Sequence, residues 1–322
     1  MKNSDYKKLQ NYERLLKYIM VCIVLVMIVI PLYKNYKYST AEKDFFISEK
    51  TINLGMLYPK YQTTTNNNKI FNINANRSLN QSENNILFYN ISGDIEDDYY
   101  KKINFSAEKG LYNQEKSTID FSQGVSFISQ DNFQLESNKA LYFLQENLIH
   151  GSNDIMFYNY MGSFFAQQYN VNLLKKQYIF LEDIKFTAND HKKTIIEAEQ
   201  IVVNDYQNNM EVEKNAKYQD NEITLTSKKF IVFYYRDMFD KLFINKVIAY
   251  NNVEILHDDA IITGDKAIFY YNKEIIEIIN NATVVKEENT VKGKKIIYDI
   301  KNDSFRVLQG KNNKVNLQLN YE

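Results

Sequence analysis

Several residue types are scarce in this chain of 322 residues. It contains 1 cysteine, 2 prolines, 9 glycines and no tryptophan. The single cysteine, Cys22, lies in an apolar segment near the N-terminus, so the rest of the chain can form no disulfide bond and offers no thiolate chemistry. The stability of that larger part must therefore come from packing and strand pairing.

Net charge is also nearly absent. The 39 basic side chains almost balance the 40 acidic ones, which leaves a formal charge of -1. Such a chain has no long-range positive field that would attract nucleic acid, so we exclude a nucleic-acid partner. The sequence also lacks a glycine-rich phosphate loop, a Gly-x-Ser-x-Gly elbow and a Cys-x-x-Cys pair.

The three histidines, His150, His191 and His257, are too few and too scattered to indicate a site. The run 257–259, His-Asp-Asp, has the residue types of a metal site, but a run of this kind between strands is usually a solvated turn. We therefore expect no catalytic residues, no cofactor and no metal, and we expect that the protein is not an enzyme.

Aromatic and β-branched residues are abundant. The chain has 26 tyrosines and 20 phenylalanines, and isoleucine and valine are frequent. These residues favour half-buried pleated surfaces, which makes a helix-rich fold improbable.

One long apolar stretch runs from Leu15 to Tyr33. As a helix it would reach about 28 Å, enough to span a bilayer. Basic residues are more frequent before it than after it, which predicts a cytoplasmic tail at 1–14 and export of everything after the helix. A cleaved signal peptide, with Ser39 and Ala41 at the cleavage site, is the alternative.

Beyond this segment the sequence repeats itself about every 30 residues. Each unit contains a small residue, with an apolar residue two positions before it and a long polar residue two positions after it. The small residues are Ala107, Ser137, Ala166, Ala198, Ser227, Gly264 and Gly293, with a weaker copy at Ala75. The apolar alternation changes parity across the small residue, which predicts one extra residue there, in a β-bulge or a corner.

Each unit is thus a bent pair of strands with one apolar face, too small to bury that face alone, so neighbouring units must stack. We predict an all-β fold, an elongated twisted β-jelly roll with an apolar interior. An insertion of about eight residues near 236–241 predicts a longer loop. The C-terminal segment alternates and indicates an unpaired edge strand suited to pairing with another protein. Its apolar residues are Val315, Leu317, Leu319 and Tyr321.

The stretch from Ile262 to Gly310 resembles the lipopolysaccharide-export bridge proteins, whose repeats share the OstA-like β-jelly-roll unit. Segments 263–267, 282–285 and 291–299 follow the family pattern in order. Residues 196–201 resemble the opening of the soluble bridge component, LptA. The resemblance implies a complete LptA-like region over residues 187–322.

The N-terminal half resembles LptC, the membrane-anchored partner, in its layout and in Phe105-Ser106-Ala107-Glu108 with Gly124-Val125. The resemblance implies an LptC-like region at 42–186, joined near 187–194 to the LptA-like one. The segment at 15–33 would anchor the chain in the inner membrane as a single pass, with the bulk of the chain in the periplasm.

The resemblance implies transport. Lipopolysaccharide would leave an inner-membrane ABC transporter, place its acyl chains in the groove and move toward an outer-membrane translocon. The hypothesis assigns to the groove wall Phe105, Tyr112, Phe121, Phe127, Tyr142, Phe164, Ile196, Ile201, Val203, Phe230, Ile262, Phe269, Ile278, Ile296 and Tyr298. For each of them, ordinary core packing is the alternative.

Other interpretations of the sequence remain open. The polar residue after each small one, often lysine, could grip lipid phosphates, but a solvated outer face is favoured. A membrane-anchored repeat enzyme acting on polysaccharide would place aromatic and acidic clusters on one outer face. A structural envelope spacer would have a solid core.

Overall fold

The computed structural model describes residues 55–64, 70–97, 101–129, 133–190, 192–237, 242–287, 289–308 and 316–318. The predicted tail at 1–14 and membrane segment at 15–33 lie outside these residues. Within the described ranges, no helix combines the length and apolar character needed to cross a membrane. The described residues all belong to one compact unit, 54–322.

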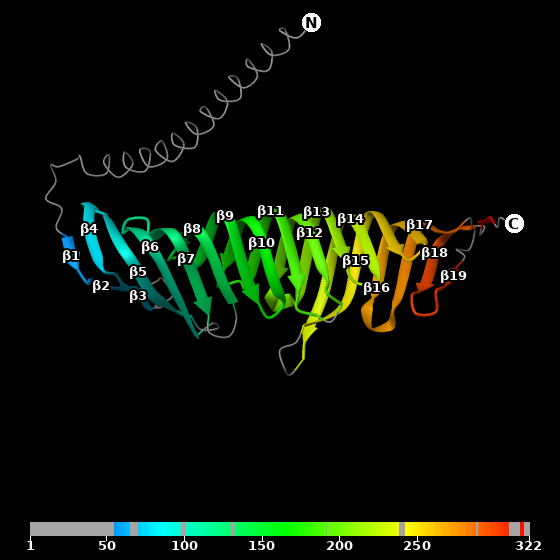
Figure 1. Cartoon of the computed structure of the whole chain (residues 1–322), viewed down its shortest axis with the longest axis horizontal. Helices are drawn as coiled ribbons and strands as arrows, with labels where there is room; N and C mark the ends of the chain where they lie inside the picture. The colour runs from blue at the N-terminus through cyan, green and yellow to red at the C-terminus, as the bar shows by residue number, and fades with distance from the viewer. Residues whose placement is uncertain are drawn as a thin grey trace, which may run out of the picture. The chain divides into compact units, whose positions relative to one another are not determined.

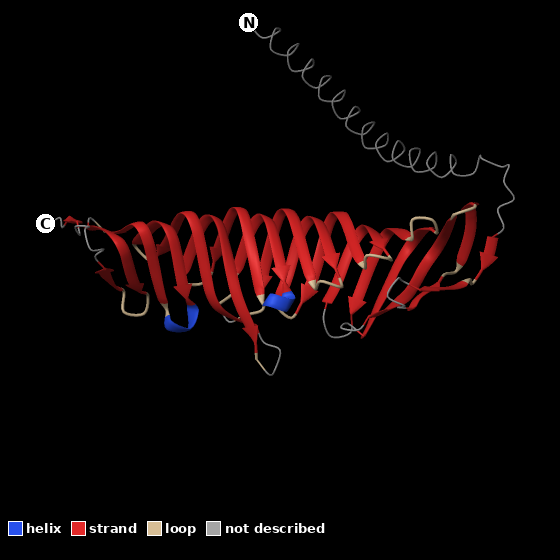
Figure 2. Ribbon diagram, turned by 180° about the vertical axis from the view of Figure 1, so that it is seen from behind, coloured by secondary structure: helices blue, strands red, loops and turns tan. Residues whose placement is uncertain are grey.

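This unit is built almost entirely of β-strands (Figures 1 and 2), as the composition predicts. The strands are β1 Gly55–Leu57, β2 Lys60–Thr64, β3 Ile70–Asn74, β4 Arg77–Ser82, β5 Asn85–Asp97, β6 Lys101–Asn113, β7 Thr118–Ser129, β8 Phe133–Phe143, β9 Leu148–Asn159, β10 Gly162–Asn172, β11 Gln177–Ala188, β12 Ile195–Asn204, β13 Asn209–Gln219, β14 Ile223–Arg236, β15 Leu242–His257, β16 Ala260–Tyr270, β17 Ile275–Lys286, β18 Asn289–Asp299, β19 Ser304–Leu308 and β20 Asn316–Gln318. Two short 3-10 turns, η1 Asp205–Gln207 and η2 Tyr271–Lys273, interrupt the pattern.

From β5 to β19, each strand pairs antiparallel with the next one along the chain. The strands therefore follow one another along the long axis of the unit in Figure 1. Because every pairing joins sequence neighbours through a short connection, little loop-closure entropy opposes the ladder.

The long strands bend near the middle, and from β7 to β17 every second strand does so at residues with left-handed backbone angles. The strands β7, β9, β11, β13, β15 and β17 each have two successive residues with positive φ, namely Gln123-Gly124, Asn153-Asp154, Glu182-Asp183, Lys214-Asn215, Asn251-Asn252 and Asn280-Asn281. Glycine, asparagine and aspartate adopt this conformation at the least cost, which explains their frequency at these sites.

The bend corrects one detail of the sequence prediction. The extra residue does not lie in the strand with the small residue but in the strand opposite. Ser122 pairs with Lys139 and Val125 pairs with Ser137, so β7 advances three positions where β8 advances two. The small residues lie at the corner itself; Gly264, for example, has no room for a Cβ, which would approach Ile278 to 2.5 Å.

The bends divide the strands between two layers that face each other. Layer one contains the described residues of 109–122, 139–152, 168–181, 200–213, 229–250, 266–279 and 295–308, and layer two those of 101–107, 125–137, 155–166, 184–198, 216–227, 253–264 and 282–293. The core lies between the layers: the ring of Phe164 in layer two stacks on Phe180 in layer one, with centroids 4.5 Å apart. This arrangement agrees with a β-jelly roll.

The weaker repeat at Ala75 marks a strand that is broken rather than bent. Before the break, Phe71 of β3 pairs with Ile95 of β5, and after it Leu79 of β4 pairs with Leu87 of the same strand. One strand of the ladder is thus split between the two layers. Pro59 interrupts the preceding strand between β1 and β2 in the same way, because proline has no N–H to donate to a ladder.

The ladder runs through the predicted junction at 187–194. Tyr178 of β11 pairs with Val203 of β12, and the two strands stay in register up to Thr187 and Ile195. The expected insertion near 236–241 lengthens β14 and β15 themselves, and their hairpin projects beyond its neighbours in Figure 1.

The C-terminal strand differs from the prediction of an unpaired strand. Leu317 of β20 pairs with Val291 of β18, so β20 has one partner within the chain. The other predicted edge residues, Val315, Leu319 and Tyr321, lie outside the described residues.

A substitution at one bend tests whether left-handed angles are required there. Asn280 is exposed and has φ of 60°. We expect Asn280→Val to lower the free energy of unfolding by about 1–2 kcal/mol, because a β-branched side chain clashes with the backbone in this conformation. Asn280→Gly should leave stability within about 0.5 kcal/mol of the wild type. Chemical denaturation measures both, and equal losses for the two variants would contradict the role of the bend.

Candidate functional site

All fifteen residues predicted to line a groove point into the space between the layers. Each is buried, with at most 4% of its surface exposed. Layer two provides Phe105, Phe127, Phe164, Ile196 and Ile262, and layer one provides Tyr112, Phe121, Tyr142, Ile201, Val203, Phe230, Phe269, Ile278, Ile296 and Tyr298. The inward orientation is confirmed, whereas contact with lipid stays a prediction.

These side chains belong to one apolar cluster that extends from Phe71 to Ile300. The interior is therefore continuous along the unit and has no polar partition between the two halves. Among the described residues, the buried polar side chains are Ser78, Ser129, Ser137, Asn147, Thr194, Asp205, Ser227 and His257.

The chemical character of the interior changes along the unit. In the first half, phenylalanine rings contact one another across the layers: Phe121 meets Phe127 edge to face at 5.4 Å, and Phe164 stacks on Phe180 at 4.5 Å. In the second half, isoleucine and valine dominate, as at Ile201 and Val203. The change falls near the predicted junction at 187–194.

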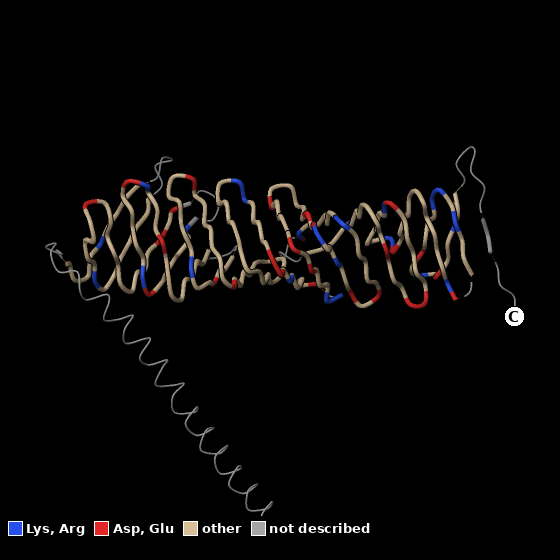
Figure 3. The backbone as a smooth tube through the Cα atoms, turned by 90° about the horizontal axis from the view of Figure 1, so that it is seen from above, with Lys and Arg blue, Asp and Glu red and all other residues tan. Residues whose placement is uncertain are grey.

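The repeated lysines lie on the outer face of layer one, as the favoured interpretation holds. Lys229 pairs with Glu211 at 2.8 Å and with Glu213 at 2.7 Å, and these hydrogen bonds raise the pKa of its ammonium group. Lys295 pairs with Glu277 at 2.9 Å. Figure 3 shows basic and acidic residues interspersed along the unit, so no single-sign field develops.

A cavity of about 420 Å³ lies on the outside of the bends of β7 to β10. Its wall includes Gly124, Asn138, Met156 and Phe165, and the last two side chains are more than 40% exposed. The cavity is therefore separate from the apolar interior.

The two layers meet at their hairpin turns, along a line that we name the seam. On the layer-one side lie turns 114–117, 144–147, 173–176, 205–208, 271–274 and 300–303, and on the layer-two side lie the described turn residues 160–161, 189–190, 192–194, 220–222, 258–259 and 287. Three clusters of polar side chains join the two rows of turns. We name them latches one, two and three.

Latch one consists of Tyr160 from layer two and of Asp205 and Arg236 from layer one. The Tyr160 hydroxyl donates a hydrogen bond to the Asp205 carboxylate. The Arg236 guanidinium donates to the same carboxylate at 3.2 and 3.3 Å and lies 3.4 Å from the centre of the Tyr160 ring. Asp205 is only 8% exposed, and these hydrogen bonds supply the partners that a buried carboxyl group requires. Burial raises the pKa of the Tyr160 phenol, which keeps its proton for this bond.

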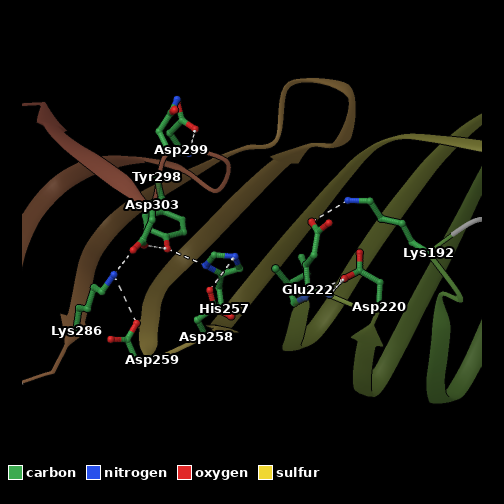
Figure 4. A network of polar contacts seen from close by, with 12 residues as sticks. Lys192, Asp220, Glu222, His257, Asp258, Asp259, Lys286, Tyr298, Asp299 and Asp303 are labelled. Carbon is green, nitrogen blue, oxygen red and sulfur yellow. Dashed lines mark hydrogen bonds and ion pairs between the residues drawn. The ribbon is translucent and has the colours of Figure 1, made fainter.

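Latch two consists of Lys192 and Glu222 from layer two and of Tyr271 from layer one. The Lys192 ammonium donates to Glu222 at 2.8 Å, as Figure 4 shows, and lies 4.8 Å from the centre of the Tyr271 ring. A cation above an aromatic face is attracted to it, so this contact ties the two rows of turns together.

Latch three consists of His257, Asp259 and Lys286 from layer two and of Tyr298 and Asp303 from layer one (Figure 4). The Tyr298 hydroxyl donates to Asp303 at 2.7 Å and lies 2.8 Å from Nδ1 of His257. Because the phenol has one proton, Nδ1 must be the protonated ring nitrogen. Lys286 pairs with Asp303 and lies 3.6 Å from Asp259.

Sequence reasoning missed the latches. It assigned Tyr298 to the groove wall and regarded 257–259 as a solvated turn, whereas His257 is only 6% exposed and its ring faces Tyr298. The available signal was weak: tyrosine and aspartate recur at strand ends, but nothing in the sequence pairs Tyr160 with Asp205. No group of three potential metal ligands occurs within the described ranges.

A comparison with protein families gives a match in the second half of the unit. Residues 195–304 match the family described as LptA/(LptD N-terminal domain) LPS transport protein. This segment is similar to the lipopolysaccharide-transport proteins of that family. The resemblance of the second half to LptA is thereby supported, whereas an LptC-like first half stays a prediction.

Among solved structures, the chain is similar to LptH, the LptA homologous periplasmic component of the lipopolysaccharide transport device of Pseudomonas aeruginosa. The two share 12% identity over 40% of this chain and 96% of LptH, with a TM-score of 0.37. No curated protein matches the chain.

Latch three predicts a specific dependence of stability on pH. Hydrogen bonds from Lys286 and Tyr298 hold the pKa of Asp303 below its ordinary value of 3.8. A carboxyl group whose pKa is lower in the folded state than in the unfolded state stabilises the folded protein at every pH above its unfolded pKa. This contribution is lost as the pH falls through the lower pKa of the folded state. We therefore expect Asp303→Asn to be less stable than the wild type at pH 7, with the difference shrinking as the pH falls below 3.8 and through the lower pKa of the folded state.

Denaturant midpoints of both proteins, measured from pH 7 down to pH 2, test this. Asp299→Asn is a suitable control, because Asp299 also has a lowered pKa but hydrogen-bonds to Asn302 within its own turn. A difference between Asp303→Asn and the wild type that stays constant over the whole pH range would contradict the assignment.

Proposed function

We propose that this chain binds lipopolysaccharide between its two layers and passes it across the periplasm, from the inner-membrane ABC transporter toward the outer-membrane translocon. The observation that carries the proposal is the continuous apolar interior, in a unit whose residues 195–304 match a lipopolysaccharide-transport family. Each acyl methylene exposed to water costs about 0.8 kcal/mol, so a lipid with several long chains needs such a sheltered path.

The proposal includes an arrangement of the chain. Segment 15–33 would anchor it in the inner membrane, 42–186 would act as the LptC-like part that receives lipid, and 187–322 as the LptA-like part that passes it on. The family match supports the last of these assignments, since it lies within that segment. The ladder between β11 and β12 would give lipid an unbroken path between the two parts.

A structural spacer is the second candidate, because the interior side chains pack against one another with almost no exposure. Lipid could enter such a core only if the layers move apart. The polysaccharide-acting enzyme has less support, since the largest buried side chains include many of the aromatic residues that it would need on an outer face.

A photoreactive amino acid in place of Phe269 separates transport from the spacer. Phe269 is 1% exposed and lies in β16. If lipid occupies the interior, irradiation in cells should give a covalent lipopolysaccharide adduct that is detected by a mobility shift and by antibody. The matched control is Ile261, which lies in the same strand but is 44% exposed on the outer face. Adducts at neither position, or equal adducts at both, would contradict transport through the interior.

We further propose that copies or partners join the unit end to end through strand pairing. Both ends carry exposed apolar side chains: Met56 and Leu57 at the first strand are 62% and 75% exposed, and Phe305 and Leu308 at the other end are 37% and 44% exposed. Edge strands of this kind offer unpaired backbone groups together with apolar contacts.

Substitution of Leu57 by lysine tests end-to-end association. A lysine at an edge opposes pairing with another strand, so Leu57→Lys should weaken association of the full chain by about tenfold or more, as measured by sedimentation over a range of concentrations. Leu256→Lys, which alters a 41% exposed leucine in the middle of the ladder, serves as the control. Association that is unaffected by Leu57→Lys would show that this end does not take part.

A further inference from the structure

The apolar interior is closed in different ways on its two sides. On one side, each strand crosses from layer to layer at its bend, so the backbone itself forms the wall; Ser137 and Val125, for example, remain paired next to the bend. On the other side is the seam, where the described hydrogen bonds between the two rows of turns are made by side chains. Separation of the layers at the seam therefore leaves every ladder intact.

We propose that acyl chains enter and leave the interior sideways through the seam, and that latches one, two and three hold this passage closed. The inference rests on the proposed function, because it names the route to the interior that such transport requires. It also identifies a site for the lipid head group. The sugars and phosphates would remain outside the seam, among the charged and aromatic side chains of the latches, while the acyl chains lie between the layers.

The chemistry of latch three suits a closure that opens repeatedly. Ion pairs near the surface contribute little net stability, because water hydrates both charges when the pair separates. Lys286, Asp259 and Asp303 in latch three are partly exposed and would be hydrated on opening. Turn residues earlier in the seam are apolar instead: Leu144 and Leu173 are both 1% exposed. Separation of the layers at these turns would expose apolar side chains to water, which is unfavourable. The polar latches therefore mark the part of the seam that separates most easily.

The chain provides a matched pair of lysines for a test. Lys286 bridges the seam to Asp303, whereas Lys295 pairs with Glu277 on the outer face of neighbouring strands. The side chain of Lys286 is 28% exposed and that of Lys295 is 33% exposed. Substitution by methionine removes the charge from each and retains the length of the side chain. The two variants therefore differ mainly in whether the lost ion pair crosses the seam.

Opening of the seam can be measured without lipid. In the full-length chain with Cys22→Ala, a cysteine at Ile276, which is fully buried and pairs in register with Tyr298, reports access to the interior near latch three. We expect Lys286→Met to increase the rate of maleimide labelling at this position at least threefold, a modest change because the lost ion pair is partly exposed to water. Lys295→Met should leave the rate within twofold of the unsubstituted reporter.

A second reporter and a second latch exclude unfolding as the cause. A cysteine at Ile119, which is fully buried in the first half, should be labelled at the same slow rate in every variant. Tyr160→Phe removes only the hydroxyl that bonds to Asp205 in latch one, and it should accelerate labelling of a cysteine at Val203, one of the buried residues nearest that latch. This variant keeps the ring under Arg236 and so retains most of the packing.

The lipid measurement uses purified lipopolysaccharide and the photoreactive residue at Phe269. We expect Lys286→Met to shorten the time for adduct formation at least threefold relative to Lys295→Met. Labelling that is unchanged in both latch variants would overturn the role of the latches. Faster labelling with unchanged lipid uptake would overturn the seam as the lipid route while leaving the proposed function in place. A chain that takes up no lipopolysaccharide in any variant would overturn the proposed function, and the lipid route with it.

Discussion

The whole unit depends on a pair of left-handed residues in the middle of a β-strand. Side chains alternate between the two faces of a strand, so a straight strand can offer one apolar face to one layer only. At positions such as Asn251-Asn252 the strand turns by one extra residue, and its second half points its apolar side toward the first. Repetition of this bend encloses an interior without help from a disulfide bond or a helix.

Because the strands bend on one side only, the apolar interior is closed differently on its two sides. Backbone closes the interior at the bends, and side chains close it at the seam. At the seam, the side chains can separate and meet again while all ladder hydrogen bonds remain. At the bends, opening would break the hydrogen bonds of the backbone itself. The latches at Asp205 and Asp303 therefore occupy the part of the molecule where a change of a few contacts alters access to the apolar interior.

Much of the fold follows from local sequence. Alternation and a repeated small residue were enough to place inward residues such as Phe121 and Ile262 and to predict stacked, bent strands. The side of the bend that holds the extra residue was assigned wrongly, because the parity change in one strand does not reveal which of two paired strands is longer. The pairing of Leu317 with Val291 was also missed, since the sequence says nothing about which strand a terminal segment will meet.

The sequence by itself determined which side chains are apolar, how often they recur and where the chain can bend, because these properties depend on residues a few positions apart. The tertiary structure alone decided which turns face each other. Tyr160 and Asp205 are 45 positions apart, and Tyr298 meets His257 across 41 positions. Such contacts form only after the two layers have folded together, so a local sequence pattern does not predict them. These are the contacts that close the apolar interior at the seam.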